Sequence, residues 1–153
     1  MSDLRADDDG LAIRRVFDAP REAVWREWTH PEAFADWYGG PEAEVPLETV
    51  TMDVREGGAW ALTMFFGAGR REIRWEGEYR EVVAPERLVF TITDRPGEET
   101  FELITVVLRE LDDGRTEMDF HQGRGMTPAA YERAGRGWTG FFDRLAARLA
   151  AVG

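Results

Sequence analysis

The sequence predicts an α+β domain in which a curved antiparallel β-sheet of about seven strands is covered by one long C-terminal helix. Three observations support this. Two helix starts follow a strand-like run within residues 15–41, residues 47–122 alternate between apolar and polar side chains, and residues 128–149 carry an apolar stripe at helical spacing. A sheet with one apolar face needs a cover, and the last helix is the element long enough to supply it.

Residues 1–10 are expected to form a disordered acidic tail, and residues 11–153 a single domain. The segment MSDLRADDDG has acidic clusters and no apolar run, so it does not resemble a signal peptide. No later run reaches the length that spans a membrane, and we expect a cytoplasmic protein. A domain of this size buries roughly 70% of its unfolded surface.

Two short helices are predicted from repeated start signals near the N-terminus. Asp18 is placed to cap the first helix, and Pro20 occupies an early helical position where no amide donor is required. Thr29 and Glu32 then have the spacing of a capping box. A second helix is therefore expected over residues 31–37, before a Gly-Gly-Pro turn ends it.

The strands are predicted from alternation between turn signals, with residues 11–18 as the first. Glycine-rich or proline-containing turns separate the later runs, and Asp112-Asp113-Gly114 is a strong hairpin signal. The residues expected to face inward are Val50, Met52, Val54, Trp60, Leu62, Met64, Phe66, Ile73, Trp75, Gly77, Tyr79, Leu88, Phe90, Ile92, Phe101, Leu103, Thr105, Val107, Thr116, Met118, Phe120 and Gln122.

The C-terminal helix is predicted to begin after Thr127 as its cap. Its apolar stripe consists of Tyr131, Ala134, Trp138, Phe141, Phe142, Leu145 and Leu149. Gly135, Gly137 and Gly140 interrupt this helix, and each costs about 1 kcal/mol relative to Ala. Glycines at such positions permit a close approach or a bend.

Five segments of the chain form a recognisable series: RVFDAPREAVWREWTHPE, WYGGP, MDVREGGAW, GEYREVVAPERLVFT and GWTGFFDRLAARL. In this order they resemble the homologues of the activator of the ninety-kilodalton heat-shock chaperone's ATPase, within the START-like (SRPBCC) superfamily. The resemblance implies a helix-grip fold, in which the sheet curves around the C-terminal helix. It specifies no activity, because the superfamily includes lipid carriers, aromatase/cyclases and chaperone regulators.

Composition excludes several kinds of chemistry. The chain has no Cys and no Lys, its single Ser is Ser2, and its two His residues are His30 and His121. Thiolate chemistry, Schiff bases and a serine triad are therefore excluded. We expect no metal, because the two His residues are separated and lie in no acidic cluster. The net charge of −11 argues against nucleic acid as a partner.

Aromatic and Met side chains on the predicted inward faces suit a planar hydrophobic ligand in a pocket of about 300–1,000 Å³. An ordinary packed core is the alternative that the same pattern allows. The family resemblance favours a cavity. Its predicted lining is Trp37, Trp60, Met64, Phe66, Trp75, Tyr79, Phe90, Phe101, Leu103, Met118, Phe120, Trp138 and Phe142.

Few polar groups are placed to orient such a ligand, and the candidates are Tyr79, Gln122, Thr105, Tyr38 and Arg15. Arg15 is expected to be buried and to need a partner, which Asp53, Glu48 or a ligand carboxylate would supply. His121 points outward by the alternation of its strand. Asp53 and Arg55 are expected to lie on a solvated face or to form a cross-strand salt pair. His30 is assigned a structural role in a helix cap.

Three functional hypotheses follow. The leading one is binding of a small hydrophobic or aromatic molecule between the sheet and the C-terminal helix, without a cofactor. The second is an aromatase/cyclase-like enzyme in the same cavity, with Tyr79, Arg15 or His121 moving a proton. The third is a chaperone-regulating interaction module. No nucleic-acid or membrane partner is expected, and the sequence leaves a homodimer open.

Overall fold

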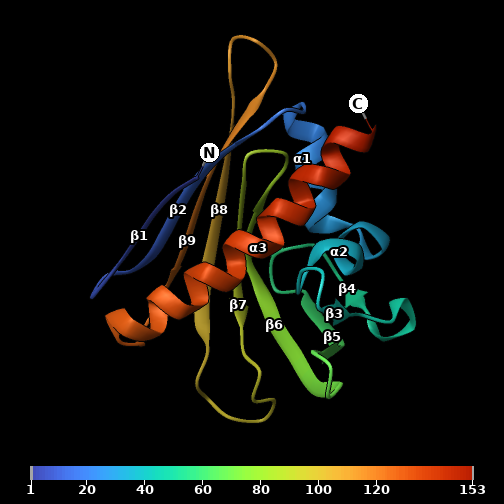
Figure 1. Ribbon diagram of the computed structural model, residues 1–153, viewed down its shortest axis with the longest axis vertical. Helices are drawn as coiled ribbons and strands as arrows, with labels where there is room; N and C mark the ends of the chain where they lie inside the picture. Colours follow the sequence, from blue (N-terminus) through green and yellow to red (C-terminus); the bar gives the residue numbers. More distant parts are fainter. Residues whose placement is uncertain (1, 153) are drawn as a thin grey trace.

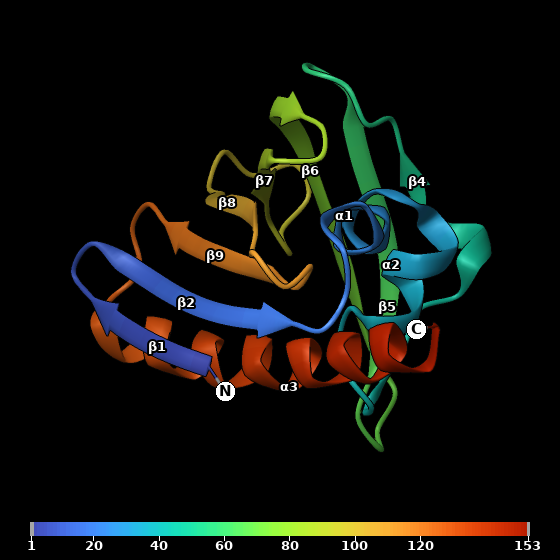
Figure 2. The same cartoon turned by 90° about the horizontal axis from the view of Figure 1, so that it is seen from above.

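The computed structural model describes residues 2–152, which form one antiparallel sheet with helices on its concave side (Figures 1 and 2). The helices are α1 (Arg21–Thr29), α2 (Pro31–Trp37) and α3 (Pro128–Val152), with a 3₁₀ turn η1 (Leu47–Thr49). The strands are β1 (Ser2–Asp7), β2 (Gly10–Phe17), β3 (Ala43–Glu44), β4 (Thr51–Met52), β5 (Ala59–Phe66), β6 (Arg71–Val83), β7 (Arg87–Ile92), β8 (Glu102–Glu110) and β9 (Thr116–Gly123).

The sheet runs in the order β1-β2-β9-β8-β7-β6-β5-β3, and β4 also pairs with β5. β5 to β9 form a meander, whereas β2 pairs with β9 and so joins the first long strand to the last. Figure 2 shows the strongly curved sheet, with α1, α2 and α3 on its concave side. The α+β class and the long C-terminal helix are confirmed.

The N-terminal segment departs from the prediction of a disordered acidic tail. Residues 2–7 form β1, which pairs with β2 from Ser2 opposite Arg15 to Asp7 opposite Gly10. β1 lies at the edge of the sheet, where side chains remain in contact with water. Its acidic residues are therefore compatible with a strand. Asp7 accepts a hydrogen bond from the Asp9 amide at 2.8 Å within the turn.

The strand count is nine and not seven, because β1 and the short β3 were missed. The strand predicted over residues 50–54 is reduced to β4, two residues long. Asp53 to Gly58 form a tight loop instead, in which the Gly57 amide donates to the Tyr79 carbonyl at 2.8 Å. Asp53 and Arg55 make an exposed ion pair of 2.8 Å, as expected of a solvated face.

The inward face of β8 is displaced by one residue from the prediction. Ile104, Val106 and Leu108 are buried, while Thr105 and Val107 are only half-buried. The register places Ile104 opposite Gln122 and Val106 opposite Phe120, both of which face inward. Leu103, Thr105 and Val107 therefore lie on the other face. Apolar residues occur on both faces of β8. Alternation alone therefore assigned the wrong face to the interior.

The two short helices have the predicted positions but not the predicted caps. Pro20 is the N-cap of α1 and His30 that of α2, and neither helix has a side-chain cap hydrogen bond. Thr29 donates to the Trp25 carbonyl at 2.8 Å instead of capping α2. The cap of α3 is confirmed, since the Ala130 amide donates to Thr127 Oγ1 at 3.2 Å.

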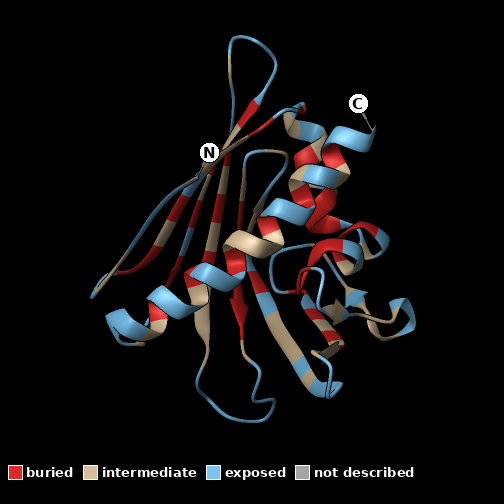
Figure 3. Ribbon diagram, viewed as in Figure 1, coloured by how far each residue is buried: buried red, intermediate tan, exposed pale blue. Residues whose placement is uncertain are grey.

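Helix α3 buries the predicted stripe against the sheet (Figure 3), including Tyr131, Trp138, Phe142, Leu145 and Leu149. Near its C-terminus, Arg148 forms ion pairs with Glu27 of α1 and Asp36 of α2. Gly135 is the close approach in this helix, because a Cβ there would lie 2.7 Å from Leu4 and 2.9 Å from Leu11. No helix in residues 2–152 is both long and apolar enough to cross a membrane.

Candidate functional site

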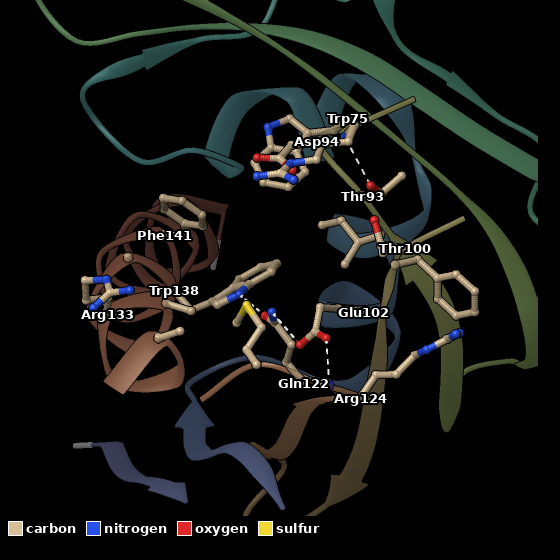
Figure 4. A pocket seen from close by; sticks show the side chains of 18 of the residues that line it. Trp75, Thr93, Asp94, Thr100, Glu102, Gln122, Arg124, Arg133, Trp138 and Phe141 are labelled. Atoms are coloured by element: carbon tan, nitrogen blue, oxygen red, sulfur yellow. Dashed lines mark hydrogen bonds between the residues drawn. The ribbon is translucent and has the colours of Figure 1, made fainter. Parts of the chain in front are cut away.

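A cavity of about 730 Å³ lies between the sheet and the N-terminal half of α3 (Figure 4). Its volume falls in the range of small-molecule sites. Strands β6 to β9, the segments that follow β7 and β9, and α3 all contribute. The lining residues are Tyr38, Trp75, Ile92, Thr93, Asp94, Arg95, Thr100, Phe101, Glu102, Gln122, Arg124, Gly125, Met126, Ala130, Arg133, Ala134, Gly137, Trp138 and Phe141.

One wall of the cavity is a preassembled aromatic cluster. The Tyr38 ring centroid lies 6.0 Å from that of Trp75, 5.7 Å from that of Trp138 and 5.5 Å from that of Phe141. Trp138 and Phe141 are themselves 5.4 Å apart. Because these rings support one another in edge and tilted contacts, the wall is formed without a ligand and offers flat apolar area.

A chain of hydrogen bonds extends from Trp138 of this wall along the cavity. Trp138 Nε1 donates to Gln122 Oε1 at 2.8 Å, and Gln122 Nε2 donates to Glu102 Oε1 at 3.4 Å. The Gly125 amide donates to the other Glu102 oxygen at 3.2 Å. Figure 4 shows Glu102 and Gln122 together beside Trp138. The chain fixes the indole ring of Trp138 and places a carboxylate in the cavity.

The loop from Arg124 to Met126 is held by one hydroxyl group. Tyr131 Oη accepts hydrogen bonds from the Arg124, Gly125 and Met126 amides at 3.0, 3.1 and 3.1 Å. Arg124 has a φ of 153°, which is rare for a residue with a side chain and costs about 1–3 kcal/mol. Its guanidinium carbon lies 3.8 Å from the Phe101 ring centroid. The strained loop is thus anchored at both its backbone and its side chain.

Tyr38 supplies a neutral phenol to the cavity. Burial, and then the nearby charge of Asp94, raise the pKa of Tyr38 well above its ordinary value. Both effects disfavour the phenolate, so the hydroxyl keeps its proton at neutral pH. It remains able to donate a hydrogen bond as well as to accept one.

Gly137 keeps the cavity open on the helix side. A Cβ built at this position would meet only the tip of the Phe141 ring, at 4.0 Å. Gly140 is also free of neighbours within 4 Å, but it does not line the cavity. The two glycines therefore cost the helix similar stability, whereas only Gly137 faces the cavity.

Of the predicted lining residues, Trp75, Phe101 and Trp138 line this cavity. Phe66 is half-buried, and Leu103 lies on the opposite face of the sheet. The others pack in the core, each with at most 3% of its surface exposed: Trp37, Trp60, Met64, Tyr79, Phe90, Met118, Phe120 and Phe142. The aromatic interior is thus mostly solid, and the cavity occupies its edge.

The predicted polar groups are divided between the cavity and other sites. Gln122 and Tyr38 line the cavity. Arg15 pairs with Asp143 of α3 at 2.7 Å, and not with Asp53 or Glu48. His121 is exposed on the outer face, as predicted, with Nε2 3.1 Å from the Asp9 carbonyl oxygen. Tyr79 is buried elsewhere in the core, and Thr105 lies on the outer face.

Sequence reasoning missed the charged residues of the cavity, which are Asp94, Arg95, Glu102, Arg124 and Arg133. A signal for two of the segments existed, because β8 pairs with both β7 and β9. The segment after β7 and the segment after β9 must then meet at the start of β8. Within residues 3–151, no group of three His, Asp or Glu side chains is arranged to hold a metal.

Comparison with known proteins assigns the fold to a family. Residues 18–150 match the model described as activator of Hsp90 ATPase homolog 1-like protein. The chain belongs to this family. No curated protein matches the sequence.

Several solved structures share the fold of this family member. One from Chromobacterium violaceum is 27% identical with a TM-score of 0.79, over 92% of this chain and 96% of that one. One from Rhodobacter sphaeroides is 19% identical with a TM-score of 0.83, over the full length of both. The AHSA1 protein from Silicibacter pomeroyi is 18% identical with a TM-score of 0.79, over 93% and 99%. At 18–19% identity, the last two comparisons concern the fold alone.

Proposed function

We propose that this protein binds a small hydrophobic or aromatic molecule in the cavity between the sheet and α3. The observation that carries the proposal is a cavity of about 730 Å³ with a preformed wall of Tyr38, Trp75, Trp138 and Phe141. A rigid aromatic wall favours affinity, because little side-chain entropy is lost when a flat ligand binds. The proposal requires no cofactor, and we expect the protein to act in the cytoplasm.

The two alternatives from the sequence have less support. Tyr79, Arg15 and His121 were the residues assigned to proton transfer, and none of them lines the cavity. A chaperone-regulating module would be expected to show a contiguous exposed apolar patch. Within residues 3–151, the large exposed hydrophobic side chains are Leu4, Leu47 and Val83, on three separate elements.

The test uses Gly137→Leu, which is expected to fill the cavity without harming the fold. Leu restores helix propensity worth somewhat under 1 kcal/mol, so the melting temperature should stay equal or rise. The side chain should occupy the ligand space and weaken binding of the neutral fluorescent probe N-phenyl-1-naphthylamine by about tenfold or more. Fluorescence titration and thermal unfolding measure the two effects.

Gly140→Leu is the matched control, since it makes the same change three residues along the helix and outside the cavity. It should leave probe affinity unchanged. If the parent binds no probe, or if both variants weaken binding equally, the proposal is wrong.

A further inference from the structure

The cavity differs from the rest of the surface in how its positive charges are paired. All 19 basic residues are arginines, since the chain has no Lys. Within residues 3–151, most of them lie within 4.0 Å of a carboxylate oxygen. Those without such a partner in this part of the chain are Arg26, Arg71, Arg74, Arg95, Arg124 and Arg133. Half of this set, namely Arg95, Arg124 and Arg133, lines the cavity between the sheet and α3.

We propose that the cavity binds an apolar molecule carrying an anionic group such as a carboxylate, and that the positive charge of Arg95, Arg124 and Arg133 at the rim selects for this group. The proposal rests on the proposed function and specifies the class of ligand. An unpaired arginine is not a site by itself, as Arg26, Arg71 and Arg74 illustrate. Arg95, Arg124 and Arg133 differ from those three because they line one cavity, where the local charge is positive and the backbone of Arg124 is strained.

The three rim arginines come from separate segments that the fold places around one cavity. Arg95 follows β7, Arg124 follows β9, and Arg133 lies in the first half of α3. Figure 4 shows Arg133 and Arg124 on opposite sides of the cavity. Because the start of β8 pairs with the ends of both β7 and β9, the segments that carry Arg95 and Arg124 lie next to each other. Exposed guanidinium groups on both sides give the rim a positive potential that attracts an anionic ligand.

The local charge balance favours an anion, although the whole chain carries −11. The charged residues that line the cavity are three arginines, Arg95, Arg124 and Arg133, and two carboxylates, Asp94 and Glu102. Glu102 already accepts hydrogen bonds from Gln122 and from the Gly125 amide. Charges beyond about 8 Å are screened at physiological ionic strength, so the rim determines the potential that a ligand meets there.

Arg124 provides an independent observation. Its backbone has a φ of 153°, a conformation that glycine adopts more easily, and the sequence already has glycines on either side. Its guanidinium stacks on Phe101 with the carbon 3.8 Å from the ring centroid. Stacking leaves the N–H donors, which lie in the guanidinium plane, available to a carboxylate. Strained backbone at a residue that has a side chain is typical of functional sites.

The experiment compares two probes that share one ring system. N-phenyl-1-naphthylamine is neutral, and 8-anilinonaphthalene-1-sulfonate carries an anionic group on the same framework. The two should displace each other from the parent protein. In a combined Arg95→Gln, Arg124→Gly, Arg133→Gln variant, affinity for the sulfonate should fall by about tenfold or more relative to affinity for the neutral probe. Added salt should reduce this preference in the parent.

Two further variants separate recognition from general charge and from stability. A combined Arg26→Gln, Arg71→Gln, Arg74→Gln variant removes the same charge outside the cavity and should leave the ratio of the two affinities unchanged. Arg124→Gly alone should weaken sulfonate binding while the melting temperature holds or rises, because the strain is relieved.

The outcomes distinguish this inference from the proposed function. The inference is wrong if the ratio of sulfonate affinity to neutral-probe affinity is unchanged in the variant that lacks the three rim arginines, or if it changes equally in the variant that lacks Arg26, Arg71 and Arg74. Either result leaves the proposed binding function intact. Binding of neither probe by the parent overturns both. Loss of sulfonate binding only in the rim variant supports the inference.

Discussion

A chain that ends at Gly125 is expected to lose cooperative folding, because α3 covers the sheet. Its buried side chains Tyr131, Trp138, Phe142, Leu145 and Leu149 each contribute about 1.5–3 kcal/mol. Their sum is similar to the roughly 5–15 kcal/mol by which a whole domain is stable. The truncation also removes Asp143 and Arg148, so Arg15 and Glu27 lose their ion-pair partners.

Near-ultraviolet circular dichroism and amide hydrogen exchange measure this outcome. A chain that ends at Leu149 serves as the control, since it keeps every buried residue of the stripe and should fold like the parent. If the chain ending at Gly125 keeps native-like packing as a monomer, α3 is an accessory and the cavity loses its second wall.

The largest effect of a single substitution is expected for Trp28→Ala. Trp28 is 1% exposed and lies at the junction of α1, α2, α3 and the sheet. Its ring centroid is within 6.4 Å of those of Phe34, Trp37, Phe90, Phe120, Trp138 and Phe142. Deleting a packed Trp of this kind costs about 3–5 kcal/mol, because the rigid neighbours cannot fill the space.

Trp25→Ala is the matched control on the same helix, since Trp25 is only half-buried. Denaturant unfolding of both variants should show a loss for Trp28→Ala at least about twice that for Trp25→Ala. Equal losses would mean that Trp28 is not the centre of the aromatic core.

The sequence predicted well the elements whose two faces differ sharply. Thr116, Met118, Phe120 and Gln122 are buried as expected, and His121 between them is exposed. The stripe of α3 was predicted for the same reason. Prediction failed in β8, where apolar side chains occupy both faces. It also failed in β1, whose acidic residues tolerate an exposed edge.

The candidate site was less predictable, because a core and a cavity wall use the same residue types. Trp60 and Phe120 are as aromatic as Trp75 and Trp138, yet the first two pack in the core. Whether an inward ring meets a neighbour or a space depends on three-dimensional packing. The charged residues of the rim lie on segments that are distant in the sequence. Only the order of the strands shows that the segments after β7 and β9 meet. The positive φ of Arg124 could not be predicted from the sequence.

The most direct measurement of the central claim is the nuclear magnetic resonance spectrum of the tryptophan indole N–H groups during titration with N-phenyl-1-naphthylamine. The chain has 6 Trp residues, of which Trp75 and Trp138 line the cavity, whereas Trp25 of α1 is half-buried and does not line it. A bound aromatic ring shifts the resonances of the groups that it contacts. The account predicts saturable shifts for Trp75 and Trp138 and none for Trp25. Shifts at Trp25 with Trp75 and Trp138 unmoved, or no saturable shift at all, would contradict it.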